Sequence, residues 1–526
     1  MNAPIPVAGE AARRLAGAAG PVPARRLLVL TAQLVLTSDT TMGGGEGSED
    51  DDIVVVRDPS TGRPLLPAST QAGLLRHHLT AWTQQAHRVE ALFGTTERTS
   101  AFSPRHAIAT TAHTGRRDGN RVSPSTGRVE RGGLFSMQVL PAGTVFPLCW
   151  EVDLGADPAT QAEQVAAVTV LGEALAAGGI RLGHRQRRGR GAVTADAWRA
   201  RVFDLSDTQD WQEWFTHPYP EQPQLLTALA PSPTITTALT AALGAELAGQ
   251  TTLPDTRSRA VLTLQLATRE WQPGPKEAVQ VASTMVQGGP GTTVNGRSPL
   301  RRPTLTTAAR ADDAAVGDTA GTSDPVGVVE QAVDSGAAVH SMLGRTARTI
   351  LSTLAGGDPA RDARAAALHT RLFGGQHPTT AAAVPSRIRE DEQPFLGATP
   401  LRLTRNRIHP LTHAVVPGFL FVDEVLHGGH RQLRLELTDP TAAELALLGL
   451  ILRDLAEGFG ATTGAGASHG HGRRLLTTAT VQLHNTPLGS PGFNRLSSFL
   501  THLQNNKALP TLLAEIGGNP GDDAAR

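Results

Sequence analysis

The feature that most constrains this chain is a stretch of sequence that occurs twice. From Asn120 to Gly143 it reads NRVSPSTGRVERGGLFSMQVLPAG, and from Asn406 to Gly429 it reads NRIHPLTHAVVPGFLFVDEVLHGG. The two copies align without a gap and share the Asn-Arg pair, the Leu-Phe dipeptide, a Val-Leu dipeptide and the last glycine. Such a match predicts that the chain is an internal duplication, so its other landmarks are read in pairs.

Further landmarks do recur in the same order. They are the aliphatic runs Leu27–Leu36 and Ala260–Ala267, the tripeptides Leu92-Phe93-Gly94 and Leu372-Phe373-Gly374, the helical patterns Thr160–Ala177 and Leu445–Phe459, and the loops Gly183–Gly191 and Gly464–Gly472. Each copy reads as strand, loop, strand, helix, β-hairpin, helix, Gly-rich loop and strand. This order predicts an α+β fold of two tandem ferredoxin-like, RRM-like domains with long loop insertions. The same scaffold serves many RNA-recognition domains.

The length of 526 residues suits two or three domains. We expect a flexible tail over 1–24, a first domain over 25–201, a helical linker over 202–257, a second domain over 258–485 with a long insertion at about 271–336, and a C-terminal tail over 486–526. Ser69 and Thr70 are predicted to cap a helix that continues to Leu92.

Composition excludes several classes of protein. Lys plus Arg equals Asp plus Glu at 48 each, which argues against a dedicated polycation. The one cysteine, Cys149, excludes an intramolecular disulfide and a multi-cysteine zinc site, and its apolar surroundings predict a buried structural thiol. No apolar run approaches the roughly 18 residues of a membrane helix, and the N-terminus lacks the apolar core of a signal peptide. A cytoplasmic location is therefore expected, without membrane partners.

Two loops carry residues suited to chemistry on nucleic acids. The loop Thr37–Asp52 is Gly-rich and ends in Asp50, Asp51 and Asp52. Adjacent carboxylates can hold a hard divalent ion, although a run of acids read alone is more typical of a solvated turn. The loop Gly183–Gly191 holds four arginines among glycines, which favours contact with phosphates over a merely exposed basic turn.

Together these motifs resemble the RAMP superfamily of CRISPR proteins. The residues that carry the resemblance are VVVRDPSTGRPLLPAST, the Leu-Phe-Gly tripeptides, GGLF followed by VLPAG, and RLGHRQRRGRG. Within the superfamily the chain is most similar to the backbone subunit of type III interference complexes, in two fused copies, as in type III-D-like effectors. The resemblance covers about 27–200 well, and about 258–484 with a rebuilt loop between strand and helix.

The resemblance implies a ribonucleoprotein of antiviral defence. The partners it implies are a CRISPR RNA, a single-stranded target RNA, and the large, small, guide 5′-end cap and further backbone subunits of the complex. It also implies an endoribonuclease whose loop aspartate supports target cleavage to a 2′,3′-cyclic phosphate with Mg²⁺ or Mn²⁺. Setting Arg57-Asp58 on the family's basic-acidic pair places that aspartate at Asp52, with Asp51 second and Asp50 third. Asp52 and Asp51 are the expected metal ligands.

The same resemblance suggests which residues contact RNA. They are Arg57, Ser69, Thr70, Arg76, Arg121, Gly183, Arg185, Arg187, Arg188, Arg190, Arg345, Arg348, Arg407 and Arg473. For Arg121 and Arg407, bonding within the hairpin is an equal alternative to RNA contact. Leu134, Phe135, Leu420 and Phe421 are expected in the core. The family's base-wedging hairpin is expected within 98–128 and 377–410.

Two other functions stay open at the level of sequence. One is a non-catalytic scaffold that binds guide and target. The other is a metal-independent guide-processing endonuclease, in which His106, His113 or His184 acts as general acid or base. A second cleavage centre at Asp312 or Asp313, in the long insertion, is a further alternative.

Overall fold

The aliphatic strand β1 (Arg26–Leu36) is the centre of the first of two sheets in the computed structural model of the chain. The structure describes residues 25–517 except 44–46, 48–50, 123–128, 218–221, 246–252, 269–278, 281–284, 288–296, 300, 306–327, 335, 377–381, 428, 458–459 and 464–470. β1 pairs antiparallel with β7 (Val145–Leu154) and β8 (Val193–Asp204). β3 (Phe102–Pro104) joins the edge of β7, so the order is β3-β7-β1-β8.

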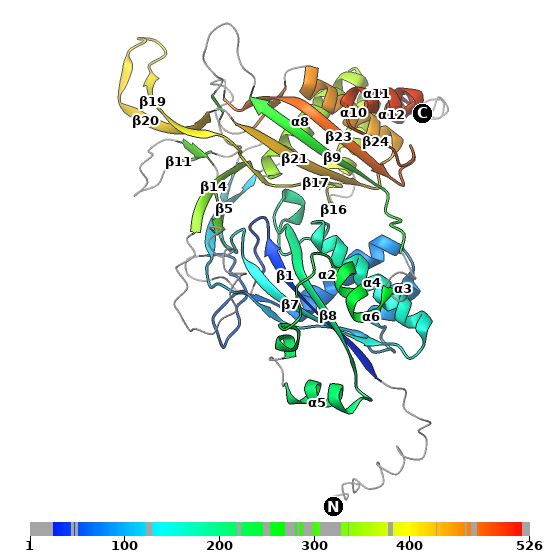
Figure 1. Cartoon of the computed structure of the whole chain (residues 1–526). Helices are drawn as coiled ribbons and strands as arrows, with labels where there is room; N and C mark the ends of the chain where they lie inside the picture. Colours follow the sequence, from blue (N-terminus) through cyan, green and yellow to red (C-terminus); the bar gives the residue numbers. More distant parts are fainter. Residues whose placement is uncertain are drawn as a thin grey trace, which may run out of the picture.

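Helices cover one face of this sheet: α2 (Ala68–Thr83), α3 (Ala86–Phe93) and α4 (Pro158–Ala176) (Figure 1). Leu28 and Leu30 of β1 face these helices, while Leu27 and Val29 face a second, smaller apolar cluster. Both faces of β1 are therefore covered, which explains why its sequence is almost continuously aliphatic. Cys149 lies in the smaller cluster, and burial raises the pKa of its thiol to about 12. The predicted buried cysteine is confirmed.

The second sheet repeats this order around β9 (Arg259–Thr268). Its strands are β17 (Ile388–Glu390), β21 (His430–Thr438), β9, β23 (Arg473–His484) and β22 (Ala461–Thr462), with β24 (Gly492–Phe493) on β23. α8 (Gly336–Ala355), α9 (Pro359–Phe373) and α10 (Ala442–Glu457) pack on one face with α11 (Leu496–Asn505) and α12 (Ala508–Gly517). The predicted mixture of helices and antiparallel sheets is confirmed.

The remaining elements are short or connect the two sheets. They are β2 (Leu65–Leu66), β4 (Ala107–Ile108), η1 (Gln186–Arg188), α5 (Thr208–Thr216), η2 (Gln222–Leu226), α6 (Ile235–Leu243), β10 (Val279–Gln280), β11 (Met285–Gln287), β12 (Arg297–Pro299), β13 (Arg301–Leu305), β14 (Val328–Asp334), β15 (Gly375–Gln376), β16 (Ala383–Val384) and β18 (Gln393–Pro394).

The repeated stretch forms a β-hairpin twice, as β5 (Gly115–Val122) with β6 (Val129–Val139) and as β19 (Thr399–Ile408) with β20 (Val415–His427). Asn120 pairs with Leu134 and Asn406 with Leu420, and both ladders shift register immediately afterwards. Each hairpin therefore has an irregularity at the same place, which the sequence repeat alone did not reveal.

Leu134 and Leu420 were expected in the core, and this expectation is wrong. They are 75% and 64% exposed. For Leu420 the reason is that β19 and β20 project beyond the packed sheets (Figure 1), so residues with a core-like pattern remain at the surface.

The predicted helix start and length also need correction. α2 begins at Ala68 after Pro67, whose extended backbone and fixed φ suit an N-cap, and no side chain caps the helix. Ser69 and Thr70 lie inside the first turn. Gln84 then adopts a left-handed conformation and divides the expected single helix into α2 and α3.

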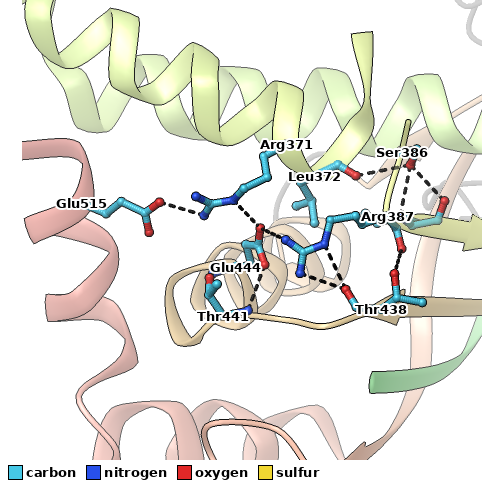
Figure 2. A network of polar contacts seen from close by, with 9 residues as sticks. Arg371, Leu372, Ser386, Arg387, Thr438, Thr441, Glu444 and Glu515 are labelled. Carbon is cyan, nitrogen blue, oxygen red and sulfur yellow. Dashed lines mark hydrogen bonds and ion pairs between the residues drawn. The ribbon is translucent and has the colours of Figure 1, made fainter. Parts of the chain in front are cut away.

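In the second half, Glu444 joins three segments of chain (Figure 2). Its Oε2 accepts the backbone N–H of Thr441 at 2.9 Å, and its own N–H donates to Thr441 Oγ1 at 3.2 Å, which is a capping box. Its Oε1 accepts from Arg371 at 2.8 Å and from Arg387 at 2.9 Å. α10 is thereby fixed to α9 and to the segment before β17.

The two halves stack so that the second sheet faces α2 of the first half (Figure 1). A cavity of about 270 Å³ between them is lined by His78 of α2 and by Arg389 and Glu436 of the second sheet. Next to it, the Arg257 guanidinium lies 4.4 Å from the Trp82 ring centre. The junction is therefore built from charged groups around an imidazole.

This junction predicts a stability that falls in acid. Burial, together with the neighbouring Arg257, lowers the pKa of His78 from 6.5 to about 4. Arg389 lowers this pKa further, whereas the carboxylates of Asp255 and Glu436 raise it by less than the other effects lower it. As pH falls, His78 takes up a proton in the unfolded chain before it does so in the folded chain. The free energy of unfolding therefore decreases between about pH 6.5 and pH 4, by about 2 kcal/mol at pH 5.

Denaturant unfolding at pH 7 and pH 5 tests this expectation by comparing wild type with His78→Gln, which cannot titrate. The variant is expected to lose about 2 kcal/mol less between the two pH values. His77→Gln, at the exposed neighbouring position, is the control and should behave like wild type. Equal pH dependence of wild type and His78→Gln would contradict the expectation.

Candidate nucleic-acid interface

The acidic loop is held along strand β6 by backbone contacts. Ser136 N–H donates to Asp52 Oδ2 at 2.7 Å, and Asp52 N–H donates to the Ser136 carbonyl at 3.2 Å. Ile53 then bridges to Met137 in parallel. Asp52 is exposed, so a fixed carboxylate is presented at the surface beside the repeated stretch.

Asp51 points elsewhere. Its side chain is only 9% exposed, and Arg116 of β5 places its Nε 3.4 Å from Oδ1. Asp50 lies outside the described residues. Among the residues that the structure does describe, no three His, Cys, Asp or Glu side chains converge to form a metal cluster. Asp52 fits a cation that takes one protein carboxylate and completes its shell with water and phosphate oxygens, as Mg²⁺ commonly does.

A buried ionic network lies behind this loop and joins the two halves. Arg117 Nη1 contacts Asp39 Oδ1 at 2.9 Å and Glu392 Oε1 at 2.8 Å. All three side chains are at most 5% exposed. Burial lowers the pKa of Arg117, but the Glu392 and Asp39 carboxylates outweigh it and raise the pKa above its usual value. The sequence does not reveal this network, because its members come from three distant segments.

The Gly-rich loop packs directly against the acidic loop. His184 N–H donates to the Thr41 carbonyl at 2.9 Å and Gly191 N–H to the Asp39 carbonyl at 3.1 Å. A Cβ on Gly191 would lie 1.8 Å from the Leu182 oxygen, in a backbone with φ of +73°. The glycine is therefore required by contact between chain segments. Packing within the protein is therefore sufficient to explain Gly191, without any contact with RNA.

The four arginines of this loop have different surroundings. Arg190 is buried, with Nη1 2.8 Å from Met137 Sδ, and Arg185 lies over the Phe135 ring at 4.6 Å. Arg187 and Arg188 are exposed, and Arg187 donates to the Ser386 carbonyl of the second half. Burial lowers the pKa of Arg185 to about 10, with Arg190 and Arg188 adding to the effect. The loop thus places positive charge beside strand β6, to which Asp52 is hydrogen-bonded.

Other predicted RNA contacts lie at several surfaces. Ser69 and Arg76 are exposed on α2, Thr70 is half-buried, and Arg345 and Arg348 are exposed on α8. The remaining positions are Arg57, which donates to the Gly62 carbonyl and to Thr114, Gly183 in the loop, Arg407 stacked over Phe419, and exposed Arg473. The side chain of Arg121 lies outside the described residues, as do Asp312 and Asp313.

The three histidines considered as acid or base do not converge on one site. His106 Nδ1 accepts the Ala68 N–H at 3.2 Å, so it satisfies the start of α2. His184 lies over Gly43, where a Cβ would be 3.2 Å from its Nε2. His113 is exposed.

A comparison with protein families supplies an independent finding. Residues 33–194 match the RAMP superfamily. This match supports RAMP membership, and its span contains the acidic loop, the first hairpin and the Gly-rich loop. RAMP proteins generally work in CRISPR complexes with RNA and other subunits. No curated protein matches the chain. Of the helices that the structure describes, none has the length and hydropathy to cross a membrane.

Proposed function

We propose that this chain is a tandem of two ferredoxin-like RAMP domains that serves as a backbone subunit of a type III-like CRISPR ribonucleoprotein. It binds CRISPR RNA and cleaves complementary target RNA at Asp52. The observation that carries the cleavage proposal is the exposed Asp52 carboxylate, held by Ser136 N–H within the RAMP-matching segment. The repeated sheet order and hairpin register support the tandem arrangement.

Exposed arginines of both halves are assigned to the RNA backbone. Arg187 and Arg188 lie on the Gly-rich loop, and Arg345 and Arg348 on α8. Guanidinium groups bind phosphates without reading bases, so affinity falls with salt while specificity comes from guide pairing. The hairpins β5–β6 and β19–β20, with exposed Leu134 and Leu420, are assigned to wedge between bases.

The chemistry assigned to this site is attack of a target 2′-hydroxyl on the adjacent phosphate, with departure of the 5′-oxygen. Asp52 would hold a Mg²⁺ or Mn²⁺, and the ion would neutralise charge on the scissile phosphate. Ser136 N–H fixes one oxygen of Asp52, which orients the other for a ligand. Asp51 pairs with Arg116 of β5. The half-exposed guanidinium of Arg116 therefore lies beside the acidic loop. The proposed function also includes action in the cytoplasm and a role in antiviral defence.

Target cleavage by the guide-loaded complex with Mg²⁺ or Mn²⁺ tests the proposal. Asp52→Asn keeps an acceptor for Ser136 N–H but removes the charge, and we expect cleavage to fall about 100-fold or more with target binding unchanged. Asp58→Asn, in a nearby exposed turn, is the matched control and should cut normally. Wild-type cutting by Asp52→Asn would overturn the assignment.

A non-catalytic scaffold is the second candidate. It is favoured by the burial of Asp51 and its pairing with Arg116, which leave one described carboxylate at the surface of the loop. This function predicts that wild type binds guide and target but leaves the target intact with either metal. A guide-processing activity instead predicts cutting of precursor RNA in EDTA.

A further inference from the structure

The cavity of about 270 Å³ between the two halves, here called the junction cavity, has walls from both of them. The first half contributes α2 and the segment 179–187, and the second half contributes β17, the residues just before it and β21. Among the described residues that line the cavity, arginines outnumber carboxylates: they are Arg181, Arg187, Arg257, Arg387 and Arg389, against Glu436. The lining is therefore strongly cationic.

Three side chains at this cavity keep polar nitrogens that form no hydrogen bond with any described residue. They are Nε2 of His78, Nε and Nη1 of Arg181, and Nε of Arg389. His78 and Arg181 are only 8% and 4% exposed. Buried polar groups are nearly always paired in native proteins, because an unpaired group loses its hydration without a replacement. These nitrogens therefore indicate a ligand that accepts hydrogen bonds.

The two guanidinium groups are held in position by carboxylates of the second half. Arg181 donates through Nη2 to Asp391, and Arg389 donates through Nη2 to Glu436 at 2.6 Å. Each guanidinium thus uses one nitrogen for a carboxylate and keeps its Nε without a protein acceptor. Because these ion pairs fix both side chains in advance, a ligand can bind them with little further ordering.

The positive charges at the cavity act on one another. Burial lowers the pKa of Arg181 to about 10, with Asp391 opposing this change and Arg389 adding to it. The charge of Arg389 also contributes to the low pKa of His78. Arg181 therefore stays charged at neutral pH next to a second cation. An anion placed among these three side chains would relieve their repulsion, whereas a neutral ligand would not.

The number and origin of the free nitrogens favour a tetrahedral oxyanion. Four nitrogens come from three elements, namely α2, the segment 179–187 and β17. A phosphate group offers oxygens in four directions, and guanidinium groups are well suited to bind it through paired N–H donors. The volume of the cavity lies below the usual range for drug-sized ligands, so it suits a compact group.

We propose that the junction cavity binds a small phosphate anion, either inorganic phosphate or the terminal phosphate of a nucleotide, through His78, Arg181 and Arg389. The anion contacts both halves and so ties them together. A continuous RNA strand follows exposed cations, whereas Arg181 is buried, so a small anion fits the site better. The proposal makes no use of guide binding or target cleavage, so it stands or falls separately from the proposed function.

Isothermal titration calorimetry of the full chain with inorganic phosphate, at pH 7 and at an ionic strength fixed with chloride, tests the proposal. We expect one phosphate to bind per chain. Arg389→Gln combined with Glu436→Gln keeps the net charge and two groups that can still pair, but it removes a cation from the cavity. The affinity for phosphate is expected to fall about 10-fold or more. The matched control is Arg201→Gln with Glu213→Gln, which removes an ion pair of 2.6 Å outside the cavity and should bind like wild type.

His78→Phe is a second variant, which keeps an aromatic ring at this position but removes Nε2. It should weaken phosphate binding at least about 5-fold, and it keeps the proposal testable if the Arg389 double variant does not fold. Absence of saturable phosphate binding by wild type overturns the proposal. Equal affinities of wild type and these variants overturn it as well.

Two further titrations identify the source of the anion. Adenosine monophosphate presents the same phosphate group on a nucleoside, so tighter binding of it than of inorganic phosphate assigns the site to a nucleotide, and weaker binding assigns it to the free ion. An RNA oligonucleotide with hydroxyl groups at both ends carries phosphodiesters only, and its binding should not change in the Arg389 double variant. Binding of this oligonucleotide alone, and its loss in that variant, would make the cavity part of an RNA path and overturn the proposal.

Discussion

Arg117→Leu is expected to lower the free energy of unfolding by about 3–5 kcal/mol, because it leaves two carboxylates buried without their counterion. Asp39 and Glu392 are 0% and 1% exposed and lie on the same guanidinium. Burial raises the pKa of Glu392, so this group has little capacity to stay charged once Arg117 is gone. Denaturant unfolding of the full chain at pH 7 measures the loss.

Two further variants make this expectation specific. Arg116→Leu is the matched control, because its side chain is 57% exposed, both of its ion pairs are long at 3.4 Å, and one of its two partners, Asp118, is 72% exposed. We expect it to cost less than about 1 kcal/mol. Glu392→Gln added to Arg117→Leu should recover part of the stability by removing one buried charge. Equal losses for Arg117→Leu and Arg116→Leu would contradict the role assigned to the network.

The location of this network matters for how the chain works as one unit. Arg117 and Asp39 belong to the first half, whereas Glu392 follows β17 of the second half. Arg181 adds an ion pair to Asp391 beside it. Loss of Arg117 is therefore expected to loosen the junction, and protease sensitivity of the linker region is a second measurement of this effect.

Long periodic elements could be predicted from the sequence. β1, α4 and α10 lie where aliphatic or helical patterns placed them. Short edge strands such as β3 and β17 could not, because pairing with a neighbour, and not local pattern, defines three-residue strands. α2 begins at Ala68, before the expected caps Ser69 and Thr70, because the fixed φ of Pro67 outweighs the capping preference of the serine and the threonine.

The candidate site was predictable in part. The acidic residues were found from their clustering, and the structure puts Asp52 at the surface beside the repeated stretch. Sequence could not show that Asp51 turns towards Arg116 or that Arg190 is buried. Adjacent residues of a strand-like segment point in opposite directions, and which one faces solvent depends on distant neighbours.

The second large effect is expected at Glu444, where Glu444→Ala should lower the free energy of unfolding by about 3 kcal/mol. This fully buried carboxylate accepts from Arg371, Arg387 and the Thr441 N–H (Figure 2). The substitution removes the capping box of α10 together with both ion pairs. Thermal and denaturant unfolding of the full chain measure it.

Glu515→Ala is the matched control for Glu444→Ala. Glu515 is 34% exposed and pairs with Arg371 at 2.7 Å, so it tests loss of one peripheral partner of the same arginine. Its expected cost is below about 1 kcal/mol. Glu444→Gln should fall between the two, because an amide oxygen still accepts the Thr441 N–H but no longer balances two guanidinium groups. If all three variants lose the same free energy of unfolding, the contacts of Glu444 in Figure 2 do not add to the stability of the fold. In that case α10 is held by its apolar face alone.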